Sequence, residues 1–153
     1  MTGPRPSDIA RELWWVLPQQ LAGVRKPEPE ELPALQGAGI GAIVSVMDDP
    51  SNLEAYAEAG LPYQWLPVTG GTAPTLAQLE QLQTFIDQQR EAGRAIALHC
   101  SSGRRRTGTM LAAYLIRCGW AWEVALATIQ QANPAVELRA AQVEFLRSLA
   151  ASP

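Results

Sequence analysis

Short apolar runs alternate along the chain with longer stretches in which apolar residues recur at helical spacing. The runs predict strands over residues 14–18, 21–24, 42–47, 61–68 and 95–98. The helical stretches cover residues 31–37, 52–59 and 76–93, with three more around 111–118, 122–133 and 143–150. Strands that alternate with helices are typical of an α/β domain. We therefore expect a central, mostly parallel sheet flanked by helices on both faces.

Two segments carry the capping pattern that marks the start of a helix. Thr75 is followed by Gln78, and Ser51 is followed by Glu54. In each pair the hydroxyl and the later side chain can bond each other's backbone N–H groups. The strand expected over residues 61–68 contains prolines, which favour an edge position in the sheet.

The composition is that of an ordinary globular domain. The chain has 153 residues, of which 47% are hydrophobic and 18% charged, so we predict one domain over residues 1–153. No apolar run approaches the roughly 20 residues needed to cross a bilayer, and no membrane insertion is expected. The first eight residues are polar and proline-rich and lack the apolar core of a secretory signal, so we expect a cytoplasmic location.

The charge distribution is more informative than its total. A net charge of −3 argues against a general nucleic-acid-binding protein. Three consecutive arginines, Arg104 to Arg106, nevertheless form a local positive site. Such a site on an acidic protein fits a small anion better than a polyanion. The alternative is a charge run that is simply solvated.

The cysteines and the histidine indicate neither a disulfide framework nor a metal site. Two cysteines are too few to form a disulfide framework in a chain of this size. Cys118 lies in an apolar helical pattern and is expected in the core. One histidine and two cysteines in this arrangement are a poor zinc site, so we predict no metal and no cofactor.

The segment from His99 to Gly108 joins a buried strand to the start of a helix. Free backbone N–H groups and the helix dipole attract anions at such a point. The same field lowers the pKa of Cys100 and so favours the nucleophilic thiolate. Arg106, six residues later, can fold back and hold two phosphate oxygens with its planar guanidinium.

Two further residues of this loop fit the same chemistry. Gly103 lets the chain turn without a Cβ clash, and the hydroxyl of Thr107 can hydrogen-bond the sulfur as it leaves. A single cysteine at a strand end is usually structural, and this is not a Walker A loop, because no Lys-Ser or Lys-Thr pair follows the glycine. The combination of strand, His-Cys, five residues, Arg-Thr-Gly and helix outweighs these alternatives.

With this combination the sequence resembles the protein tyrosine phosphatase superfamily, whose signature is His-Cys, five residues, Arg, and then Ser or Thr. It is most similar to the small atypical dual-specificity phosphatases. The opening strand at residues 15–18 (Trp-Val-Leu-Pro) and the helix start at residues 107–112 also resemble the corresponding segments of that family. The resemblance therefore covers residues 14–149. It implies a protein tyrosine phosphatase-like fold.

The resemblance also implies roles for individual residues. Cys100 would attack phosphorus and become a phosphocysteine, while Arg106 and the loop N–H groups bind the phosphate oxygens as they gain charge. His99 would hold the loop and help to lower the pKa of Cys100. Gln142 lies near the place where some members have a glutamine that orients the hydrolytic water. The expected phosphate-binding residues are Ser101, Ser102, Gly103, Arg104, Arg105 and Arg106.

The segment that should supply the general acid departs from the family pattern. The family has an Asp there, which protonates the leaving oxygen, but residues 66–74 hold neither Asp nor Glu. Losing a positioned acid typically costs on the order of 10²–10⁴ in rate. Asp48 and Asp49 follow the 42–47 strand and so belong to the same edge of the sheet, and Asp49 is the candidate substitute. The alternative is that residues 48–51 are only a turn leading into a helix cap.

Two classes of function fit these observations. The first is a phosphatase for phosphotyrosine, and for phosphoserine and phosphothreonine as well, with a phosphoinositide phosphatase as its close variant because Arg104 and Arg105 add positive charge. The second is a module that binds phosphorylated partners without turnover; the missing acid favours it and the intact Cys100 opposes it. A rhodanese-type sulfur carrier fits the Arg-Thr-Gly end of the loop less well. The expected partner is a phosphorylated protein or a small phosphate monoester.

Overall fold

A five-stranded sheet forms the centre of the protein, whose computed structural model describes residues 8–150. In spatial order the strands are β1 (Trp14–Leu17), β2 (Leu21–Val24), β5 (Ala95–His99), β3 (Ile40–Ser45) and β4 (Tyr63–Trp65). The first two strands pair antiparallel, and every other pair is parallel. The mostly parallel sheet is therefore confirmed, and its central strand is the one that leads into the cysteine loop.

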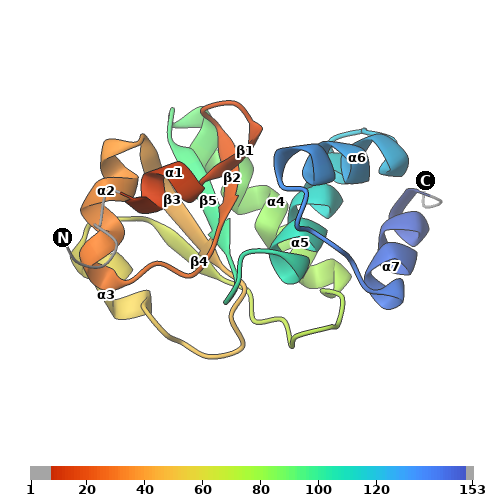
Figure 1. Cartoon of the computed structure of the whole chain (residues 1–153), viewed down its shortest axis with the longest axis horizontal. Helices are drawn as coiled ribbons and strands as arrows, with labels where there is room; N and C mark the ends of the chain where they lie inside the picture. Colours follow the sequence, from red (N-terminus) through yellow and green to blue (C-terminus); the bar gives the residue numbers. More distant parts are fainter. Residues whose placement is uncertain (1–7, 151–153) are drawn as a thin grey trace.

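Helices cover both faces of this sheet (Figure 1). One group consists of α1 (Asp8–Glu12), α2 (Leu32–Gly37) and α3 (Leu53–Glu58), with a 3₁₀ turn, η1, at Pro29–Glu31. The other consists of α4 (Leu76–Glu91), α5 (Arg105–Arg117), α6 (Trp122–Ala132) and α7 (Ala140–Ala150). A separate apolar cluster lies under each group. Within residues 8–150, no helix is both long enough and apolar enough to cross a membrane.

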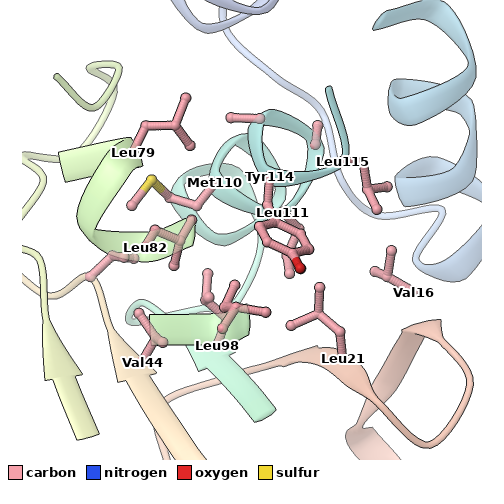
Figure 2. Close-up of a cluster of buried hydrophobic side chains, with 14 of the residues drawn as sticks. Val16, Leu21, Val44, Leu79, Leu82, Leu98, Met110, Leu111, Tyr114 and Leu115 are labelled. Atoms are coloured by element: carbon pink, nitrogen blue, oxygen red, sulfur yellow. The ribbon is translucent and has the colours of Figure 1, made fainter. Parts of the chain in front are cut away.

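The larger apolar cluster fixes the helix that follows the cysteine loop. Figure 2 shows Leu21, Val44 and Leu98 of the sheet lying below Met110 and Leu111 of α5. Every residue of α5 from position 107 to 116 is buried, because α4, α6, α7 and the sheet surround this helix. Burying one such side chain contributes about 1.5–3 kcal/mol. The N-terminus of α5 is therefore held firmly at one edge of the sheet.

The structure corrects three local expectations. The strand predicted over residues 61–68 is shorter, since β4 ends at Trp65 and Pro67 has no N–H to donate. The Thr75 cap is confirmed, but the Ser51 cap is wrong: Asn52, with φ of 71°, precedes α3 and makes no side-chain cap bond. Cys118 was expected in the core but is exposed, because it caps the C-terminal end of α5.

Candidate active site

The loop between β5 and α5 is bonded to the strands on both sides of it. The N–H of Lys26, after β2, donates to the carbonyl of Ser101 over 3.1 Å. The N–H of Val46, after β3, donates to the carbonyl of His99 over 2.9 Å. These bonds come from the carboxyl ends of parallel strands, where such folds place their ligand sites.

Gly103 allows the loop to pack directly on the backbone after β2. Its φ of +72° is in the left-handed region, which favours glycine. A Cβ at this position would overlap the carbonyl of Val24 and come within 2.5 Å of the Arg25 nitrogen. The glycine is therefore required by both conformation and space.

Cys100 lies at the bottom of the loop, with only 2% of its surface exposed. Burial alone would raise the pKa of its thiol, but hydrogen bonds outweigh burial and the pKa is lowered. The Thr107 hydroxyl donates to Sγ over 3.2 Å, and the backbone N–H groups of Gly103, Arg104 and Thr107 also support the thiolate. These groups favour the form of Cys100 that acts as a nucleophile.

His99 is fully buried and holds the loop through both ring nitrogens. Its Nδ1 donates to the Cys100 carbonyl over 3.1 Å, since that oxygen can only accept, and its Nε2 lies 2.7 Å from the Tyr56 hydroxyl. Burial lowers the pKa of His99 to about 4 and raises the pKa of Tyr56 to about 12. Tyr56 is therefore the donor and His99 is neutral. His99 has the positioning role that was expected, but it brings no positive charge to Cys100.

Tyr56 and Asn52 also support the loop, and no sequence pattern singled them out. The Asn52 amide donates to the Pro27 carbonyl over 2.6 Å and to the Tyr56 hydroxyl over 3.3 Å. Tyr56 in an apolar stretch has the pattern of any core aromatic, and Asn52 has the pattern of a turn residue. Their role follows from contacts with residues far away in the chain.

Arg106 folds back over the loop beside the cavity. Its Nη2 donates to the Ser101 hydroxyl over 2.8 Å, and its Nη1 donates to the Val68 carbonyl over 2.9 Å. The Asp48 carboxylate lies 4.0 Å from Nη1. The guanidinium is therefore held by two hydrogen bonds, and it connects the loop to the segments that follow β3 and β4.

The cavity above Cys100 has a volume of about 260 Å³. Its lining brings together most of the residues predicted to bind phosphate, and it adds a glycine pair and two residues from the connection between α6 and α7. The lining residues are Gly70, Gly71, Cys100, Ser102, Arg104, Arg105, Arg106, Ala135 and Glu137. Gly103 and Thr107 lie beneath this surface and shape it. The cavity is therefore a small site with several cationic side chains at its wall.

The connection between α6 and α7 contributes Ala135 and Glu137 to the cavity, and the sequence analysis did not predict this. Arg105 donates from Nε to the Glu137 carbonyl over 3.0 Å, so it fastens the connection between α6 and α7 to the loop. Gly108 makes this approach possible, because a Cβ there would lie 2.9 Å from Val136. Nothing in the local sequence around residues 135–137 pointed to the site.

Gln142 does not line the cavity. It is fully buried, its Oε1 accepts from the Arg139 N–H over 2.9 Å, and its Nε2 donates to the Thr72 carbonyl over 3.3 Å. Gln142 is thus in contact, through Thr72, with the segment that should have carried the acid. These bonds hold the side chain in place, and its expected role in orienting water stays a prediction.

Asp49 is exposed, and its carboxylate is bonded within its own turn. Its carboxylate accepts hydrogen bonds from the hydroxyl and the N–H of Ser51, the latter over 2.9 Å. These bonds lower the pKa of Asp49, whereas a general acid must keep its proton. The contacts favour the interpretation of residues 48–51 as a turn. Asp48, the other candidate, is the carboxylate that lies beside Arg106.

Comparison with known proteins agrees with this geometry. The family described as "Polymorphic toxin system, DSP-PTPase phosphatase" matches residues 19–120. The phosphatidylglycerophosphatase and protein-tyrosine phosphatase 1 of Rattus norvegicus is 36% identical over 75 residues, which are 48% of this chain and 39% of the rat protein. The match thus spans well under half the length of this curated relative.

Solved structures give the same fold over nearly the whole chain. Tk-PTP in its active form superposes with a TM-score of 0.85 at 24% identity, covering 93% of this chain and 98% of Tk-PTP. Human DUSP28 superposes with a TM-score of 0.79 at 24% identity, covering 97% and 95%. Since the family match includes the sheet, the cysteine loop and α5, the chain belongs to the DSP-PTPase phosphatase family of polymorphic toxin systems.

Proposed function

We propose that this phosphatase hydrolyses phosphate monoesters through a phosphocysteine. One observation supports this most: a buried Cys100 with a lowered pKa lies at the bottom of a small arginine-lined cavity. The thiolate attacks phosphorus, and the S–P bond forms as the bond to the leaving oxygen breaks. Arg106 and the loop N–H groups stabilise the charge that develops on the phosphate oxygens. Water then attacks phosphorus and releases phosphate, and the Thr107 hydroxyl bonds the departing thiolate.

The basicity of the leaving oxygen determines which phosphate monoesters can be substrates. From the segment expected to hold the acid, the cavity lining contains only Gly70 and Gly71, which have no side chain that could protonate the leaving oxygen. Asp48 replaces Asp49 as the candidate acid because of its position: its carboxylate lies 4.0 Å from Nη1 of Arg106 and can take up a proton once the phosphate becomes the partner of that guanidinium. A phenol has a pKa near 10 and departs with little help, whereas an alkoxide needs a proton. Phosphotyrosine is therefore the best protein substrate, and phosphoserine and phosphothreonine are poorer ones.

A lipid phosphate is a second candidate substrate. The rat relative is named as both a phosphatidylglycerophosphatase and a protein-tyrosine phosphatase. Arg104 and Arg105 at the cavity add charge that suits an acidic headgroup. A third candidate function is phosphate binding without turnover. The lack of an acid at Gly70 and Gly71 supports it, but the hydrogen bonds that stabilise the Cys100 thiolate argue against it, because a binding module needs no nucleophile.

One assay tests the proposed activity. We expect the purified protein to hydrolyse p-nitrophenyl phosphate in the presence of a chelator, because no metal is expected to take part. Cys100→Ser should lower kcat to background while vanadate or phosphate still binds, since a serine hydroxyl is far less ionised and the loop N–H groups remain. Turnover by Cys100→Ser well above background would rule out the phosphocysteine. Phosphate binding by wild type without any turnover would favour the binding module.

A further inference from the structure

A second cavity of about 490 Å³ adjoins the catalytic one. It lies between the segment joining α1 to β1 and the segment that follows α6, with Arg11, Trp14 and Asn133 in its lining. It also shares Ser102, Arg104 and Ala135 with the catalytic cavity. The two cavities therefore meet at the cysteine loop, and we call the second one the α1 groove.

The α1 groove is attached rigidly to the loop through Arg25. This side chain bonds Glu12 over 2.9 Å and Glu31 over 2.8 Å, so it ties the end of α1 to the turn before α2. The backbone around Arg25 is the surface on which Gly103 packs, and the next residue bonds Ser101. The position of the α1 groove relative to Cys100 is thus fixed by the fold.

Positive charge in the α1 groove is left uncompensated. The charge of Arg25 is balanced by its two carboxylates. Arg11 and Arg104 are exposed, and among residues 8–150 their side chains make no ion pair or hydrogen bond. Two free guanidinium groups on a protein of net charge −3 point to an anionic ligand at this place.

We propose that the α1 groove binds a second phosphate of the substrate, while the first phosphate is held over Cys100. This rests on the proposed function and narrows its substrates to phosphate monoesters whose leaving group carries another phosphate. Arg104 lies at the boundary between the cavities, and Arg11 belongs to the α1 groove alone. The volume of about 490 Å³ is larger than one phosphate needs, so it also accommodates the atoms that link the two groups.

The test measures the preference for a second phosphate. Calorimetry on Cys100→Ser compares a phosphotyrosyl peptide with the same peptide bearing a nearby phosphoserine, and an inositol monophosphate with an inositol bisphosphate. Arg11→Gln is added to this background, with Arg117→Gln as the matched control, because Arg117 lies at the other end of α5 and bonds Gln83. We expect Arg11→Gln to reduce the ratio of bisphosphate to monophosphate affinity roughly tenfold, as for one charge-assisted hydrogen bond, and Arg117→Gln to leave it unchanged.

The outcomes are separable from those of the activity assay. A preference that depends on Arg11 in either ligand pair supports the α1 groove, and the pair that shows it identifies the source of the second phosphate. No preference in either pair, or a preference that survives Arg11→Gln, overturns the inference even if p-nitrophenyl phosphate is hydrolysed. A preference that depends on Arg11 in a protein without turnover would retain the α1 groove and reject the hydrolytic function.

Discussion

Asp48 and Asp49 are neighbours in the chain, but their carboxylates lie in different surroundings. Ser51 holds Asp49 as an anion within a turn, and Asp48 lies 4.0 Å from the guanidinium of Arg106. Two adjacent residues thus differ in role: the carboxylate of Asp49 is bonded within a turn, and that of Asp48 lies beside the guanidinium of Arg106. The sequence identified the pair but could not choose between its members, because the choice depends on side-chain partners.

The first prediction at this scale concerns the leaving group. A series of substituted phenyl phosphates should show rates that rise steeply as the phenol becomes more acidic. Asp48→Asn should slow the least acidic phenols most, by about 10²-fold, because they depend most on a proton donor. Asp49→Asn should stay within about twofold of wild type, as expected for a solvated surface carboxylate. The measurement is kcat/KM across the series for the three proteins.

A uniform loss across the series in Asp48→Asn would assign Asp48 to holding Arg106 instead of donating a proton. A steep loss in Asp49→Asn alone would restore Asp49 as the acid. A flat dependence in all three proteins would show that another residue protonates the leaving oxygen.

At the scale of elements, the strand, loop and helix around Cys100 form one unit whose tightest point is Gly103. Gly103→Ala should destabilise the protein by about 1–2 kcal/mol from the left-handed backbone alone, and by more from the overlap with Val24. It should also reduce kcat/KM at least 100-fold, because the loop N–H groups that support Cys100 are displaced. Urea unfolding and turnover of p-nitrophenyl phosphate measure the two effects.

Gly93→Ala is the matched control for Gly103→Ala. Gly93 ends α4 with a φ of +78°, and a Cβ there would meet nothing within 4 Å. It should therefore show the backbone cost of about 1–2 kcal/mol with normal turnover. Equal losses of stability and activity in the two variants would contradict the role given to the contact between Gly103 and Val24.

The elements that were predicted well are those whose signals are local. The β5 strand, the loop and α5 occupy residues 95–117. The apolar strand, the glycine of the turn and the arginines that predicted them follow one another directly in this segment. The cap before α3 was missed because Asn52 is held by Pro27 and Tyr56, which lie 25 and 4 residues away. The end of β4 was placed too late because Pro67 has no N–H for the ladder, although Leu66 and Val68 on either side of it still donate to Ser45 and Val46.

At the scale of the whole molecule, the sequence predicted the edge of the sheet at which the site lies. The carboxyl ends of parallel strands define that edge, so Cys100 and Asp48 were expected together. Glu137 and the α1 groove were not expected, because they require the connection after α6 to fold back over the loop. Contacts between segments that are distant in the chain cannot be predicted from the local pattern of apolar and polar residues.

Burial of the protein's single histidine predicts how stability depends on pH. Burial lowers the pKa of His99 to about 4 in the folded protein, against 6.5 for an unperturbed histidine. Between these values the unfolded chain binds the proton and the folded protein does not, so the free energy of unfolding decreases as the pH falls. We expect a loss of about 2 kcal/mol from pH 7 to pH 5, measured by urea unfolding.

His99→Gln supplies the comparison, because glutamine does not titrate. Its free energy of unfolding should be lower at pH 7, where the bonds to Tyr56 and Cys100 are weakened, but nearly constant down to pH 5. If wild type and His99→Gln lose the same amount over this range, carboxylates and not His99 cause the pH dependence.

The placement of the two cysteines at opposite ends of α5 has a consequence for oxidative damage. Cys100 precedes this helix and Cys118 follows it, and the 13 residues between them in α5 span about 20 Å. A disulfide needs Cα atoms within about 7 Å of each other. If peroxide converts the Cys100 thiolate to a sulfenic acid, Cys118 is too far away to trap it as an internal disulfide. Recovery then depends on a small thiol that can reach the bottom of the cavity, and continued oxidation to the sulfinic acid is irreversible.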